Sequence, residues 1–196
     1  MPLPAPQPRK HLHTREVSFR GYEREDGLWD IEAEVCDTKT YVQNSPERGA
    51  LPPGTPIHDM AIRVTLDDAM TIVAILASMD SSPFAECPQA EDPMQKMVGV
   101  TMGPGWRFSV EKALGGIQGC THLRELLFNM ATAAYQTMAS FRVQRRKLAG
   151  LPDPIPGRPP HHLGKCMSWD FNGPVVLRRF PEFAGWQPLT HSPKPE

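Results

Sequence analysis

The sequence predicts an α+β fold, in which an antiparallel sheet of three or more strands has helices on one face. Three observations favour this class. Alternating apolar and polar residues fill much of the first half of the chain, which is typical of half-buried strands. A long segment with helical periodicity lies in the second half. Short groups of turn formers separate the alternating runs, so successive strands are expected to form a meander.

The first expected strand lies within residues 26–42, "DGLWDIEAEVCDTKTYV". Apolar residues occupy every second position from Trp29 to Val35, and acidic residues alternate with them. By the same alternation Asp37 continues the apolar face, where an unpaired carboxylate would be costly. Lys39 follows two residues along on that face and is the expected partner. The pair either ties the strand end to a loop, which we favour, or serves as base and cation at a pocket rim.

A hairpin is expected over residues 57–80, "IHDMAIRVTLDDAMTIVAILASMD". Two alternating runs join at residues 66–69, where two adjacent aspartates are typical of a turn. His58 falls on the apolar face of the first run, at the end of the buried row. Asp59 falls on the opposite, outward face, where it is either solvated or, if the strand bends, a carboxylate of the site.

Three helices are expected after the hairpin. A short one covers residues 93–98, and a second lies within residues 103–116, between a proline near its start and two glycines at its end. The long C-terminal helix should span residues 121–147. Apolar residues recur through it near the 3.6-residue period, with Thr121 as the expected N-cap and three basic residues at its end.

Composition divides the chain into three parts. Residues 1–10 are a proline-rich arm expected to be disordered, residues 11–149 a single α+β domain, and residues 150–196 a proline-rich, partly packed tail. The net charge of −1 argues against binding to nucleic acid or to a membrane surface. No apolar run approaches the roughly 18 residues of a spanning helix, and the N-terminus lacks a signal-peptide pattern. We therefore expect a cytoplasmic protein whose cysteines are thiols or ligands.

The segment "GGIQGCTHLRELLFNMA", residues 115–131, places Cys120 and His122 two apart at the start of the long helix. Together with His58 and Cys87 they form a set of thiolates and imidazoles that suits tetrahedral zinc, and three ligands plus water would leave a catalytic position open. Two alternatives stay open. The helix N-terminus could activate the Cys120 thiol with His122 as its proton partner, or these residues could be ordinary packing.

Several motifs stand out together over residues 14–140: "GYEREDGLWDIEAEVCDTKTY", "GTPIHDMAIRVTLDD", "SSPFAEC" and "GPGW...LGGIQGCTHLRELL...ATAAYQT", which contain DGLWDIE, DTK, HDM and GCTHL. In combination they resemble a bacterial family catalogued as a domain of unknown function, some of whose members are associated with catabolism of aromatic compounds. The layout is also similar to that of U-type iron–sulfur scaffold proteins. That similarity implies metal ligands at His58 or Asp59, at Cys87, and at Cys120 with His122.

The leading hypothesis is an enzyme of the lyase or hydrolase type that acts on a small aromatic catabolite, a substrate implied by the family resemblance. Its reactive centre would be lined by His58, Cys87, Cys120 and His122, the two histidines being catalytic as well. Asp37 or Asp59 would move the proton and Lys39 would stabilise negative charge. Zinc is the candidate cofactor, with iron, an iron–sulfur cluster or no metal as alternatives. The other functions considered are a metal or iron–sulfur carrier without catalysis and a binding module; the long helix and the tail favour a homodimer.

Overall fold

A computed structural model describes residues 3–151, 157–160 and 162–187, and it confirms the α+β class. The chain divides into two compact units, residues 1–145 and 146–196. Residues 1–2 of the expected arm, and residues 152–156, 161 and 188–196 of the expected tail, lie outside the described residues.

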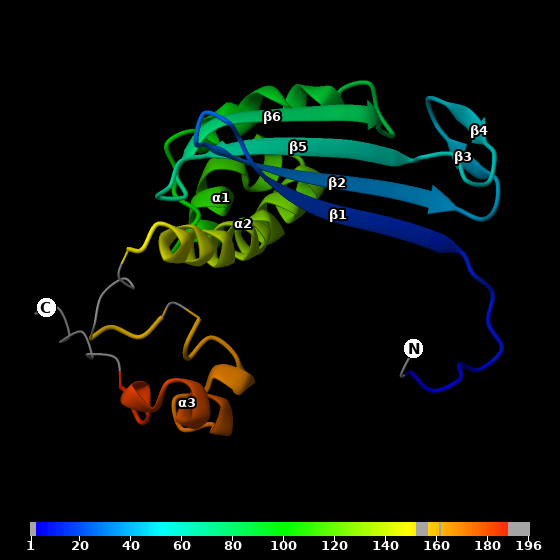
Figure 1. Cartoon of the computed structure of the whole chain (residues 1–196). Helices are drawn as coiled ribbons and strands as arrows, with labels where there is room; N and C mark the ends of the chain where they lie inside the picture. The colour runs from blue at the N-terminus through cyan, green and yellow to red at the C-terminus, as the bar shows by residue number, and fades with distance from the viewer. Residues whose placement is uncertain (1–2, 152–156, 161, 188–196) are drawn as a thin grey trace, which may run out of the picture. The chain divides into compact units, whose positions relative to one another are not determined.

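The first unit is built on a four-stranded antiparallel sheet in the order β1-β2-β5-β6. Its strands are β1 (His13–Glu23), β2 (Trp29–Lys39), β5 (His58–Leu66) and β6 (Ile72–Ser81). A separate two-stranded hairpin, β3 (Gln43–Ser45) and β4 (Gly49–Leu51), lies beyond the end of the sheet in Figure 1. The expected meander is therefore present as β2, β5 and β6, with the β5–β6 hairpin closed where expected. In the turn, Oδ1 of Asp67 accepts hydrogen bonds from the backbone N–H groups of Ala69 and Thr71.

Strand β1 and the two strands of the small hairpin are the strands that sequence reasoning missed. β1 pairs with β2 over its full length, from His13 opposite Lys39 to Glu23 opposite Trp29. As an edge strand it is mostly exposed on both faces, so its sequence carries charges where a buried strand would show strict alternation.

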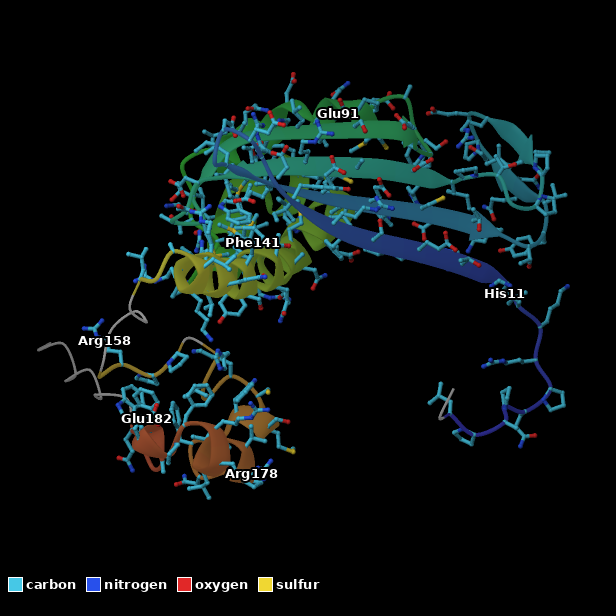
Figure 2. All side chains as sticks on the ribbon, in the orientation of Figure 1. His11, Glu91, Phe141, Arg158, Arg178 and Glu182 are labelled. Carbon is cyan, nitrogen blue, oxygen red and sulfur yellow. The ribbon has the colours of Figure 1, made fainter. Side chains whose placement is uncertain are left out.

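The core lies between one face of the sheet and the helices. In β2 the residues at every second position from Trp29 to Val35 are almost fully buried, and in β5 the same holds from Met60 to Leu66. Figure 1 shows α2 running along this face of the sheet. Phe141 of α2, labelled in Figure 2, packs edge-on against Trp29 with ring centroids 5.8 Å apart.

The helices before residue 150 include the three that were expected and two short 3₁₀ helices that were not. They are η1 (Cys87–Ala90), η2 (Asp92–Met97), α1 (Trp106–Leu114), η3 (Gly116–Gln118) and α2 (Thr121–Leu148). The short helix expected at residues 93–98 is the 3₁₀ helix η2. The backbone N–H of Arg124 donates to the carbonyl of Cys120 at 3.0 Å, so Cys120 occupies the N-cap position in place of Thr121. The buried stripe of α2 comprises Leu123, Leu126, Leu127, Met130, Ala134 and Met138.

The second unit packs around aromatic side chains. Its helical elements are η4 (Met167–Trp169), α3 (Pro174–Arg179) and η5 (Pro181–Phe183), with Arg178 and Glu182 labelled in Figure 2. Trp169 contacts His162 with ring centroids 4.6 Å apart, and Phe171 contacts Trp186 at 5.3 Å. In the part of the chain that the structure describes, no helix has both the length and the apolar character needed to cross a membrane.

Candidate functional site

The buried carboxylate of Asp37 is the centre of the candidate site. Asp37 lies near the end of β2, with Arg15 of β1 and His58 of β5 as its partners in register. Side chains opposite one another in adjacent strands share a face of the sheet and lie close together. The sheet topology therefore places a guanidinium and an imidazole on either side of one carboxylate, at the end of the sheet where His11 is labelled in Figure 2.

Three cationic or polar groups donate hydrogen bonds to this carboxylate. Arg15 donates from NH1 to Oδ2 at 2.7 Å, and His58 from Nδ1 to the same oxygen at 3.0 Å. His13 donates from Nε2 to Oδ1 at 2.9 Å. Asp37 is only 4% exposed, and a buried carboxylate is tolerated when it is paired in this way.

The contact with Asp37 also decides the protonation pattern of His58. An ionised carboxylate only accepts hydrogen bonds, so Nδ1 of His58 carries a proton. In the neutral imidazole Nε2 then keeps its lone pair, and this nitrogen can accept a proton or bind a metal ion.

His122 completes the cluster from the first turn of α2. Its ring lies against that of His58, with centroids 4.0 Å apart and planes inclined by 35°. Burial lowers the pKa of His122 below its ordinary value, and the nearby charges of His58 and Arg15 lower it further. His122 is therefore a neutral imidazole at neutral pH, next to the Sγ atom of Cys120 at 3.8 Å from Nδ1.

Asp37, His58 and His122 could together hold a metal ion. One ligand atom from each lies within 4.8 Å of the others, and among the described residues no cysteine belongs to such a group. Both oxygens of Asp37 already accept hydrogen bonds, one of them from a guanidinium. The carboxylate is thus better suited to orienting His58 than to binding an ion, and the two histidines are the better candidate ligands.

The structure separates the four expected zinc ligands into two groups. His58 and His122 are in ring contact, and Cys120 adjoins His122. Cys87 lies in η1 and lines, together with Cys120, a cleft of about 490 Å³. Cys120 is thus shared between the cluster and the cleft, while Cys87 belongs to the cleft.

Lys39 and Asp59 lie outside the cluster. The partners of Asp37 are Arg15 and two histidines, which corrects the expectation that Lys39 neutralises it. The physical reason is that residues opposite each other across a sheet approach more closely than residues two apart on one strand. Asp59 lies opposite Cys36 in register. The pKa of the Cys36 thiol is raised, mainly by burial and next by the negative charge of Asp59.

Sequence reasoning missed His13, Arg15 and Glu125. The guanidinium of Arg15 bridges two carboxylates, because NH2 donates to Oε2 of Glu125 at 2.9 Å while NH1 contacts Asp37. The sequence signal was short: only Val17 and Phe19 are apolar residues that alternate with polar ones in this segment, as on one face of a strand.

These features define a class: an α+β protein with an antiparallel sheet, helices on one face, and a pair of histidines beside a buried carboxylate. A family model described as "Protein of unknown function (DUF2889)" matches residues 13–136, and the chain belongs to this family. The match includes every residue of the cluster. Comparisons with curated proteins and with solved structures found no match.

Proposed function

We propose that the chain is an enzyme of the lyase or hydrolase type whose reactive centre is the cluster of Asp37, His58 and His122. The observation that carries the proposal is the hydrogen bond from Nδ1 of His58 to the buried carboxylate of Asp37. A carboxylate that holds an imidazole in one tautomer is the arrangement by which a histidine acts as a general base.

In this proposal Nε2 of His58 accepts a proton from a substrate hydroxyl group or from water. The charge that appears on the imidazole is stabilised by Asp37, at 3.0 Å. Neutral His122, against the ring of His58, positions the reacting oxygen or relays the proton. The roles first considered for Asp59 and Lys39 pass to His58 and Arg15, because the latter two contact Asp37 directly.

The substrate and the cofactor remain proposals of the same kind. A small aromatic catabolite is proposed from the family resemblance, with cleavage of a C–C or C–O bond. Zinc is the proposed cofactor, held by His58 and His122 with Asp37 or Cys120 nearby, and it would acidify a bound oxygen. Acid–base catalysis by the two histidines without metal is the alternative. A cytoplasmic location and a homodimer stay predictions.

The test is to assay the purified full-length chain, with and without added zinc, on a panel of hydroxylated aromatic compounds, with products identified by mass spectrometry. His58→Gln and His122→Gln should each lower kcat/KM by about 100-fold or more. His11→Gln is the matched control, since His11 is an exposed histidine outside the cluster. A turnover that both cluster variants retain in full would contradict the proposal.

A second candidate function is a metal or iron–sulfur carrier. The observation that favours it is the proximity of Cys120 to His122, together with the second thiol, Cys87, in the adjoining cleft. A carrier should be purified anaerobically with bound iron and acid-labile sulfide, which Cys120→Ser would remove. Purification with neither would count against this candidate and leave the enzyme proposal standing.

A further inference from the structure

A second cleft, of about 300 Å³, adjoins the cluster at Arg15. Its lining includes Arg15 and Val17 of β1, Arg107 of α1, and Phe128 and Asn129 of α2. A volume of this size is at the small end of ligand sites, so the cleft suits a small molecule better than a nucleotide cofactor.

The side chain of Arg107 is held in place at this cleft. Its guanidinium lies 4.8 Å from the centre of the Phe128 ring, a cation–π contact. The indole N–H of the neighbouring Trp106 donates to the backbone carbonyl of Leu127 at 2.9 Å in a buried hydrogen bond. Arg107 directly follows Trp106, and Phe128 directly follows Leu127. The buried hydrogen bond therefore ties the start of α1 to the first third of α2 and fixes both partners of the cation–π contact.

The charges of the cleft leave Arg107 as its unpaired cation. Glu125 also lines the cleft, but its carboxylate accepts from Arg15 at 2.9 Å, and the other end of that guanidinium neutralises Asp37. Arg107 makes no ion pair with any residue of the described ranges. An anion entering the cleft would therefore meet a positioned guanidinium beside the apolar side chains of Val17 and Phe128.

The cleft is also connected to the cluster. Glu125 follows His122 by three residues on α2, so the two side chains lie on one face of the helix, one turn apart. Arg15 contacts both Glu125 and Asp37 through one guanidinium. A molecule held in the cleft would thus lie beside Arg15, which contacts the cluster through Asp37.

We propose that this cleft binds a small anion with a flat apolar body, such as an aromatic carboxylate, with the carboxylate on Arg107 and the apolar body against Val17 and Phe128. The proposal rests on the proposed function in one respect: the bound anion would be the substrate, or part of it, of the neighbouring cluster. Guanidinium groups pair with carboxylates through two parallel hydrogen bonds, which favours this ligand class.

The experiment is calorimetric titration of the full-length chain with benzoate as the probe, at constant ionic strength. Benzamide keeps the ring without the charge, and acetate keeps the charge without the ring. Benzoate should bind more tightly than either. Arg107→Gln should weaken benzoate binding about tenfold or more, the loss expected for a hydrogen bond to a charged group. Lys112→Gln, on the same helix and exposed, is the matched control and should bind as the unmodified chain does.

Three outcomes would overturn the proposal: no benzoate binding at millimolar concentration, equal binding of benzamide, or equal loss of binding in both variants. Arg107→Lys adds a check on geometry, since it keeps the charge and should restore only part of the affinity. His58→Gln separates this proposal from the proposed function. It should bind benzoate normally while losing catalysis, so each proposal can fail without the other.

Discussion

Gly21 of β1 lies directly against Thr137 of α2. A Cβ atom added to Gly21 would lie 1.9 Å from Oγ1 of Thr137 and 2.7 Å from its Cβ, distances that no side chain can occupy. The hydroxyl of Thr137 is itself engaged, donating to the carbonyl of Ala133 at 2.9 Å. This close approach sets the spacing between an edge strand that carries Arg15 and a helix that carries His122.

Gly21→Ala should therefore destabilise the first unit by about 1–3 kcal/mol, as overpacking does. The measurement is urea unfolding followed by circular dichroism. Adding Thr137→Ala removes the two shortest contacts and should recover part of the loss. Gly103→Ala is the control, because its nearest neighbour would be 3.9 Å away, and it should change stability by less than about 0.5 kcal/mol. Equal effects at the two glycines would contradict the explanation.

Removing the charge of Asp37 should lower the stability of the folded chain by a large amount for a single substitution. Asp37→Asn leaves Arg15 and His58 facing an amide, and we expect a loss of about 2–3 kcal/mol in the free energy of unfolding. This is below the range for fully buried pairs, because the Arg15 side chain is 30% exposed. Glu32→Gln, which breaks a surface pair with Arg63, should cost less than about 1 kcal/mol. Comparable losses in the two variants would show that Asp37 is not the centre of the cluster.

The lowered pKa of His122 predicts a pH dependence of stability. The unfolded chain binds a proton at this residue near its ordinary value of 6.5, whereas the folded chain resists protonation until the pH is lower. Between the folded and the unfolded pKa of His122 the unfolded state holds more protons than the folded state, so the free energy of unfolding falls as the pH falls. The contribution is complete above the unfolded pKa and is lost on acidification toward the folded pKa.

This prediction can be checked by unfolding the chain from about pH 8 to about pH 5 in the presence of a metal chelator. The His122→Gln variant should show a shallower loss of stability in this range than the unmodified chain. Two profiles of equal slope would mean that His122 titrates with the same pKa in the folded and unfolded states.

Zinc should raise the melting temperature of the chain if the histidine pair holds the metal. Free zinc at about 100 times its dissociation constant would add about 2.7 kcal/mol of stability. His58→Ala and His122→Ala should each remove this effect. Cys36→Ala should keep it, because Cys36 alternates with Asp37 on β2 and so points to the other face of the sheet. If zinc leaves the melting temperature of the unmodified chain unchanged, metal-free catalysis is favoured. If zinc raises the melting temperature of all three variants, the metal site lies elsewhere.

Much of the fold was predictable because local periodicity carries it. Alternation in β2 and β5, two aspartates at the hairpin turn, and the apolar stripe of α2 each reflect a face that the element must bury. Strand β1 escaped this reasoning because an edge strand with two exposed faces has no such constraint. The 3₁₀ character of η2 also leaves no distinct pattern in six residues.

The candidate site was predictable only in part. Alternation within each strand correctly placed Asp37 of β2 and His58 of β5 on the buried face. The Cys–Thr–His segment correctly marked a helix start. The identity of the partner of Asp37 depended on strand pairing: Arg15 is 22 residues away in sequence but opposite Asp37 in the sheet. The expectation that Lys39 is the partner followed from considering one strand alone.

What the sequence established is therefore the strands β2, β5 and β6, the long helix α2 and the faces that they bury, because those follow from interactions within a few residues of chain. Which side chains surround Asp37 followed from the folded structure, which brings Arg15 and His58 to it. His58 and His122 were expected at one site, and their rings are in contact, but the sequence did not distinguish this pair from Cys87. Such contacts depend on strand order, register and helix packing, which arise from the burial of the whole core and leave no local trace in the sequence.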